Sequence, residues 1–131
     1  MSIDPNIEAI IAKAEDKLKT AQIDFSNGQY DDAVSRAYYA VYHMMTAVLF
    51  RHGQVYSSHA QTIGAFNRDF IKTAIFPKVF TRQIQGLFAD RQAGDYDVVS
   101  RIDKATAATD LTAAETICST LTTYLTNIEA R

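Results

Sequence analysis

The segment Arg36-Ala37-Tyr38-Tyr39-Ala40-Val41-Tyr42-His43 carries side chains that suit phosphate chemistry. Seven residues make about two turns of an α-helix, so Arg36 and His43 lie on one side, about 10 Å apart along the axis, with Tyr39 between them. An arginine can bind phosphate oxygens, and a histidine can exchange a proton near neutral pH. The alternative is structural: Arg36 pairs with a carboxylate, the tyrosines pack through their rings, and His43 satisfies a buried polar contact.

Arg91 is the most suggestive single position in the chain. It follows Leu87 by four residues and Phe88 by three, so it extends the apolar stripe of its expected helix. A guanidinium at the inner edge of a helical bundle has to be paired. Its partner is the nearby carboxylate of Asp95, the carbonyl groups of the helix end, another subunit or a bound phosphate. Arg91, with Asp95 and Tyr96 close behind it, is therefore the second candidate site in the chain.

Other kinds of chemistry find less support. His59, just inside the third expected helix, could donate to a phosphate or simply support the helix end. No glycine-rich phosphate loop, closely spaced Cys/His set or carboxylate-rich motif is visible, so we expect no metal and no cofactor. The single cysteine, Cys118, lies among apolar residues and is interpreted as a small core side chain.

Length and composition indicate an ordinary globular domain. The chain has 131 residues, of which 47% are hydrophobic and 21% charged, which predicts one domain over residues 1–131. The net charge of −2 argues against binding of nucleic acid through a large positively charged surface but allows a local basic patch. No signal peptide is visible, and the most apolar stretch, Ala40 to Phe50, is too short to span a bilayer. We therefore expect a cytoplasmic protein with no membrane contact.

Sequence signals mark the ends of the first two expected helices. Asp4-Pro5, an acidic cap followed by proline, opens the first, and Asn27-Gly28 ends it. The second runs from about Asp31 to His52 and is apolar on both sides, which predicts the central helix of a bundle. Its apolar stripe consists of Val34, Ala37, Val41, Met44, Met45 and Val48, beside a seven-residue repeat of small residues at Ala33, Ala40 and Ala47.

Three further helical segments are expected. The third begins at Ser57 or Ser58, and its buried face is predicted to contain Ile63, Phe66, Phe70 and Ala74. The fourth follows a break at Pro77 and stops at Ala93-Gly94, after which Asp95 to Arg101 forms a polar connection. The fold class is therefore all-α, an up-and-down helical bundle of four to five helical segments. The fifth segment repeats its apolar residues as a bundle seam does, at Ala107, Leu111, Ala114, Cys118, Leu121, Leu125 and Ile128.

These features resemble one branch of the HEPN (higher eukaryotes and prokaryotes nucleotide-binding) family, the branch associated with minimal nucleotidyltransferases. The resemblance covers about Ala14 to Leu125. Its motifs are Gly28-Gln29-Tyr30-Asp31-Asp32-Ala33, then Ser35-Arg36-Ala37-Tyr38-Tyr39-Ala40 with His43, then Ser58-His59, and finally Arg91 with Asp95-Tyr96.

The resemblance implies a helical bundle that dimerises through a central groove. Many members of the family are metal-independent RNases, often toxins encoded beside a minimal nucleotidyltransferase antitoxin. Their motif is an arginine, four to six residues, then a histidine. Arg91 matches the arginine, but the positions open to the histidine hold Tyr96, Asp97 and Val98. The resemblance thus implies Arg91, Tyr96 and Asp95 as candidate catalytic residues. An unperturbed tyrosine, with a pKa of about 10, is a poor base at neutral pH.

Two functions follow as expectations, beside a plain structural or dimerisation module in which internal partners satisfy Arg36, His43, Arg91 and Tyr96 and no shared groove is open. In the first, the chain is the toxin-like subunit of a HEPN/minimal-nucleotidyltransferase toxin–antitoxin system and acts on RNA as a homodimer, through Arg91 with Tyr96 or Arg36 with His43. In the second, it is a non-catalytic helical dimer that binds a nucleotide or a partner through the same groove. Under either, Arg36, Tyr39, His43 and His59 are candidate nucleotide- or RNA-binding residues.

Overall fold

The computed structural model describes residues 4–96 and 102–129. Within these ranges the chain forms helices and no strand, which confirms the all-α fold class. The helices are α1 (Pro5–Ser26), α2 (Tyr30–Arg51), α3 (His59–Phe66), which continues into a π-helical turn, η1 (Asn67–Ile71), then α4 (Val79–Tyr96) and α5 (Lys104–Glu129).

Local signals in the sequence set most of the helix ends. The Asp4 side chain accepts a hydrogen bond from the amide of Asn6 at 2.7 Å and caps α1 at the expected position. Gly28, with φ at +75°, turns the chain from α1 into α2. Ser58 caps α3 by accepting a hydrogen bond from the amide of Gln61 at 3.0 Å. The five expected segments are therefore present, with the third extended by η1.

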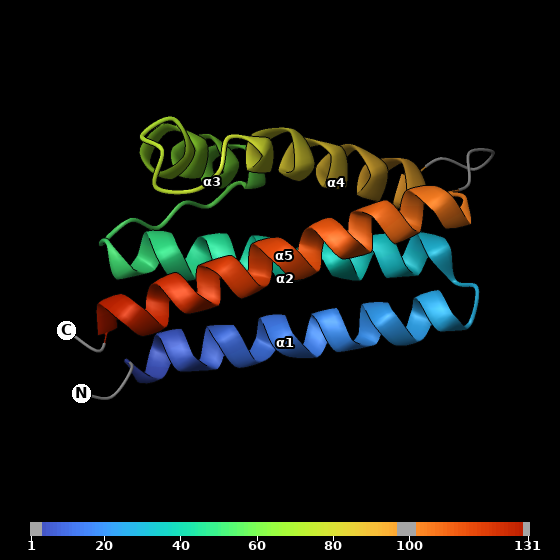
Figure 1. Cartoon of the computed structure of the whole chain (residues 1–131), viewed down its shortest axis with the longest axis horizontal. Helices are drawn as coiled ribbons and strands as arrows, with labels where there is room; N and C mark the ends of the chain where they lie inside the picture. The colour runs from blue at the N-terminus through green and yellow to red at the C-terminus, as the bar shows by residue number, and fades with distance from the viewer. Residues whose placement is uncertain (1–3, 97–101, 130–131) are drawn as a thin grey trace.

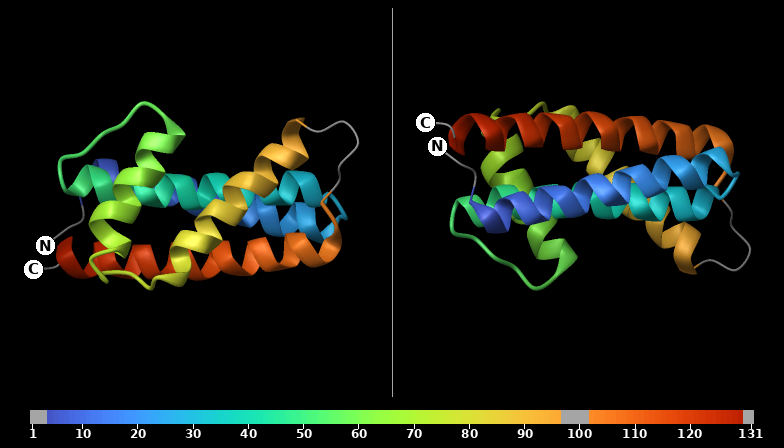
Figure 2. Two further views of the ribbon diagram at one scale, coloured as in Figure 1. Left: turned by 90° about the horizontal axis from the view of Figure 1, so that it is seen from above. Right: turned by 90° about the horizontal axis from the view of Figure 1, so that it is seen from below.

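The helices form two layers and an outer helix (Figure 1). α2 and α5 run side by side in the same direction, and α1 runs antiparallel to them along one side of the pair. α3 and α4 lie on the opposite side and cross the long helices obliquely, as the view from above in Figure 2 shows. In that view the start of α3 and the end of α4 both project past α2 on the side away from α5. This arrangement brings residues from α3 and α4 onto one face of α2.

α2 is the central helix, as its sequence predicts. It contacts α1, α3, α4 and α5. All six residues of its apolar stripe are buried, and so are the three alanines of the seven-residue repeat. The seam of α5 is also buried from Ala107 to Leu125, with Ile128 partly buried against the core. The remaining, partly exposed side of α2 includes Ser35, Tyr39, Tyr42 and His43.

Two boundary predictions are wrong. Ala74 is exposed and has φ at +63°, because the chain reverses there and returns Phe76 to the core instead. α4 does not stop at Ala93-Gly94 but continues to Tyr96. Gly94 packs closely on Asp31 of α2, where an added Cβ would lie 3.4 Å from the Asp31 Cβ. The glycine therefore marks a close approach of two helices rather than a helix end, and residues 97–101 of the expected connection lie outside the described residues.

Replacing glycine with alanine is expected to have opposite effects on stability at Gly28 and at Gly86. Gly28→Ala is expected to destabilise the fold by about 1 kcal/mol, because an L-residue is strained at the positive φ of this turn. Gly86→Ala is expected to stabilise it by about 0.5–1 kcal/mol, because Gly86 lies inside α4 with no atom within 4 Å of an added Cβ. Urea unfolding of both variants measures the difference, and a shared sign for the two changes would contradict the assignment of the turn.

Candidate functional site

Arg91 on α4 is held against the α2 tyrosines. Its side chain is 13% exposed, and its Nε lies 3.0 Å from Oδ2 of Asp95, one turn further along α4. Its Nη2 donates a hydrogen bond to the Tyr39 hydroxyl at 2.6 Å. The guanidinium carbon also lies 5.1 Å from the centre of the Tyr39 ring and 5.7 Å from that of Tyr38. The carboxylate partner expected from the sequence, Asp95, thus holds the guanidinium, together with a tyrosine of α2 that was not expected.

His59, the first residue of α3, packs on the same tyrosines. Its Nδ1 is 2.7 Å from the Tyr38 hydroxyl oxygen. Its ring stacks on Tyr42, with ring centres 4.1 Å apart and planes 16° apart, and meets Tyr39 edge-on at 5.8 Å. Burial, and secondarily the positive charge of Arg91, lower the pKa of His59 below its usual value of 6.5. The imidazole is therefore mainly neutral at pH 7.

His43 lies at the other edge of the tyrosine group. Its ring centre is 6.4 Å from that of Tyr39 and 6.2 Å from that of Tyr42. Burial lowers the pKa of His43, and the charges of Lys13 and Lys17 on α1 lower it further. His43 therefore belongs to the side of α2 that faces α1.

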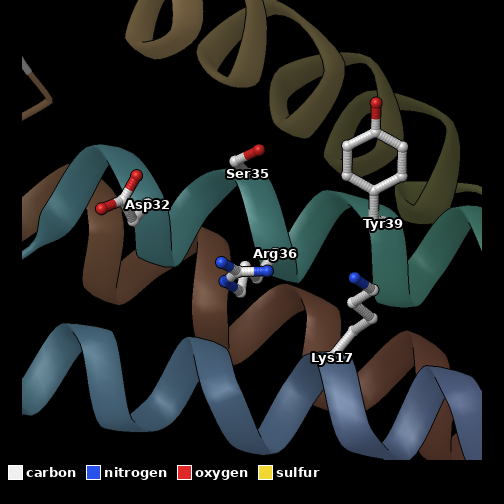
Figure 3. Close-up of a pocket in the computed structure, with 5 residues that line it drawn as sticks. All are labelled: Lys17, Asp32, Ser35, Arg36 and Tyr39. Atoms are coloured by element: carbon white, nitrogen blue, oxygen red, sulfur yellow. The ribbon is translucent and has the colours of Figure 1, made fainter.

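Arg36 turns toward α1 and away from Arg91. Its Nε lies 3.3 Å from Oδ2 of Asp24, so it has the carboxylate partner of the structural interpretation. It also lines a small hollow of about 180 Å³ between α1 and α2 (Figure 3). In Figure 3 the Tyr39 ring points up toward α4 while Lys17 rises toward it from α1. The hollow is lined by Lys17, Asp32, Ser35, Arg36 and Tyr39.

The structure thus brings several predicted site residues together and separates others. Tyr38, Tyr39, His59, Arg91 and Asp95 form one connected group, which we call the Arg91 cluster. His43 borders it through Tyr39, whereas Arg36 lies on the α1 side. The Tyr96 side chain, and Asp97 and Val98, lie outside the described residues.

Four side chains at or beside the site were given no role there from the sequence: Lys17, Ser35, Tyr38 and Tyr42. Tyr38 and Tyr42 hold His59, and the Ser35 hydroxyl donates to Oδ2 of Asp95 at 3.4 Å. The two tyrosines share the face of α2 with Ser35 and Tyr39 at spacings of three and four, which was the available signal. Lys17 gave none, because its approach to α2 depends on how α1 packs.

The described residues contain neither a candidate metal site nor a membrane-spanning helix. In residues 4–96 and 102–129, no group of three or more His, Cys, Asp or Glu side chains is placed to hold a metal ion. No helix within the same ranges is both long and apolar enough to cross a membrane.

Comparison with known proteins gives consistent matches. The protein "Putative toxin MJ0605" of Methanocaldococcus jannaschii is 36% identical over 90 residues, which cover 69% of this chain and 67% of that protein. "Putative toxin MJ0142" of the same organism is 31% identical over 101 residues, 77% of this chain and 69% of the relative. A "UPF0332 protein" of Thermotoga maritima is 33% identical over 84 residues, 64% of each chain. The matched segment therefore spans about two thirds of each relative's length.

A solved structure and a family model complete the comparison. The crystal structure of TT1696 from Thermus thermophilus superposes with a TM-score of 0.76, covering 90% of this chain and 97% of the other. The two sequences are 18% identical, so this match shows a similar fold and nothing about function. The model of the HEPN domain matches residues 7–124, which include every residue of the Arg91 cluster. The chain belongs to the HEPN domain family.

Proposed function

We propose that this protein is a toxin-like HEPN protein that binds RNA at the Arg91 cluster and cleaves it without a metal ion. The observation that carries the proposal is the partly buried Arg91 guanidinium, fixed by Tyr39 and Asp95 beside the neutral imidazole of His59. A fixed guanidinium binds phosphate oxygens in a defined orientation, and a neutral imidazole can accept a proton. RNA supplies both groups that such a site needs, a phosphodiester and a neighbouring 2′-hydroxyl.

The reaction class follows from this chemistry. Attack of the ribose 2′-oxygen on phosphorus places extra negative charge on the phosphate oxygens, and in this proposal Arg91 stabilises that charge. The reaction needs no metal ion when an arginine takes this role.

The comparisons favour a toxin over other roles for the family. Two archaeal relatives, at 36% and 31% identity, carry names that describe them as toxins. We further propose that the chain acts as a homodimer of single-domain subunits, residues 1–131, with a minimal nucleotidyltransferase as its antitoxin. A dimer would place two Arg91 clusters in one groove. The mass in solution would then be that of two 14.6 kDa chains.

The second candidate function is binding without cleavage. It is favoured by the internal pairing of Arg91 with Asp95, because a carboxylate already neutralises the guanidinium before any phosphate arrives. A non-catalytic dimer would use the same cluster to dock a nucleotide or the nucleotidyltransferase.

Incubation of the purified wild type with single-stranded RNA in EDTA tests the proposal. We expect fragments that end in a 2′,3′-cyclic phosphate and no cleavage of DNA of the same sequence, because DNA has no 2′-hydroxyl. RNA that binds but stays intact would favour the second candidate. Folded protein that neither binds nor cleaves RNA would contradict the RNase proposal and leave only the docking of a nucleotide or of the nucleotidyltransferase.

A further inference from the structure

His59 and Arg91 lie against the same two tyrosine rings. The ring centre of His59 is 5.8 Å from that of Tyr39 and 5.7 Å from that of Tyr38. The Arg91 guanidinium carbon lies 5.1 Å and 5.7 Å from the same two ring centres. The charge of Arg91 also contributes to the lowered pKa of His59. His59 and Arg91 thus belong to one aromatic cluster, and we expect a phosphate bound at the guanidinium to come within reach of the imidazole.

The other two histidines of the chain are placed differently. His52 lies at the C-terminal end of α2, where its Nε2 is 3.0 Å from the Tyr124 hydroxyl and its ring packs on Phe70. His43 lies on the α1 side of Tyr39, in the field of two lysines. His59 is thus the histidine that both Tyr38 and the charge of Arg91 reach.

The hydroxyl of Tyr38 fixes the orientation of the His59 ring. Tyr38 is fully buried, and burial raises its pKa far above the usual value of 10, so it stays a neutral hydroxyl. Tyr42 also holds the His59 ring by stacking on it, with ring centres 4.1 Å apart. When Nδ1 of His59 carries the proton and donates it to the Tyr38 oxygen, Nε2 has a lone pair for a proton from elsewhere.

We propose that His59 is the proton-transfer residue of the RNA cleavage, taking the place of the histidine absent after Arg91, and that Tyr38 is its positioning residue. This inference rests on the proposed function. The proton of the 2′-hydroxyl passes to Nε2 of His59, the bond between the 2′-oxygen and phosphorus forms, and the bond from phosphorus to the 5′-oxygen breaks. The leaving 5′-oxygen takes a proton from water, and the imidazolium returns its proton to solvent, so the step is balanced without an oxidant or a reductant.

The pH dependence of cleavage follows from the groups around His59. The titratable and charged groups that face it are Tyr38, Tyr39, Tyr42 and His43 from α2 and Arg91 from α4. Burial and Arg91 both favour the neutral imidazole. The cleavage rate should therefore rise with pH, with a midpoint below 6.5, and level off near neutrality.

The test compares the wild type with His59→Ala, with and without added imidazole. We expect His59→Ala to lower kcat about 100-fold or more, to lose the acidic limb of the pH profile and to recover part of its activity in free imidazole. Binding of a DNA strand, which has no 2′-hydroxyl and is not cleaved, should differ by less than about threefold between His59→Ala and the wild type. His52→Ala, at the other end of α2, is the matched control and should keep wild-type cleavage.

Tyr38→Phe tests the same proposal in a second variant, in case His59→Ala loses activity because it does not fold. It removes only the hydroxyl that contacts Nδ1, so we expect a folded protein whose kcat falls while its KM stays near the wild-type value. Cleavage by the wild type that survives in His59→Ala, or is lost there but not restored by imidazole in a folded protein, would overturn the role of His59 and leave the proposed function standing. No cleavage by the wild type would overturn both.

Discussion

Replacing Arg91 with alanine is expected to lower RNA cleavage by about 100-fold to 1,000-fold, the largest functional effect of any single change in this chain. The guanidinium is held by Asp95 at 3.0 Å and by Tyr39 at 2.6 Å, so it meets the phosphate already oriented. Preorganised charge of this kind contributes most where negative charge develops in the transition state. Initial rates of RNA cleavage, measured on gels, give the size of the effect. Urea unfolding of the variant shows whether it is as stable as the wild type.

Two further variants sharpen this comparison. Arg91→Lys keeps the charge but loses the planar fork that contacts Tyr39, so it should retain only a small part of the activity. Arg68→Ala removes an arginine that is 61% exposed and pairs with Asp69 in η1, outside the Arg91 cluster, and should cleave as the wild type does. An equal loss in Arg68→Ala would mean that overall charge, rather than the Arg91 cluster, drives RNA cleavage.

Asp110→Asn is expected to stabilise the protein by about 2 kcal/mol or more at pH 8.5, and by much less near pH 4. Asp110 on α5 is buried, and its carboxyl shares a hydrogen bond with Asp90 on α4. Burial, then the contact with Asp90, raises the pKa of Asp110 from 3.8 to about 8. Between these values the folded chain holds a proton that the unfolded chain has released, so wild-type stability should fall as pH rises from 4 to 8.

The measurement is the difference in unfolding free energy between Asp110→Asn and wild type across that range. Taking the difference removes the opposing contribution of His43, His52 and His59, whose pKa values are all lowered by folding. Asp90→Asn removes the neighbouring charge but leaves Asp110 buried, so it should relieve only part of the pH dependence. A flat difference between pH 4 and 8.5 would contradict the assignment of a neutral Asp110.

Much of the fold could be predicted because local chemistry determines it. Capping by Asp4, the positive φ of Gly28 and the apolar stripe of α2 act within a few residues, and each matched its expected element. The errors came from contacts between segments. Gly94 resembled a helix end, but its role is to let α4 approach Asp31, and no pattern near Gly94 contains that information.

In the candidate site, too, the local features could be predicted from the sequence and the contacts between helices could not. Arg91 stood out because an arginine on an apolar stripe needs a partner, and Asp95 is one helical turn away. The joining of Arg91 to His59 could not be predicted, since it depends on how α3 and α4 each pack on the tyrosines of α2. Arg36 and His43 share a helix face by spacing, yet the packing of α1 gives Arg36 its own carboxylate, Asp24.

The most direct test of the account is an NMR titration of the wild type with a 2′-deoxy dinucleotide, which binds without being cleaved. The Nε–H signal of Arg91 and the ring signals of His59 should shift in a saturable way, while the Nε–H signal of Arg68 should not move. That result would establish the Arg91 cluster as the phosphate-binding site independently of catalysis. Saturable shifts confined to residues outside the cluster, with Arg91 and His59 unchanged, would contradict it.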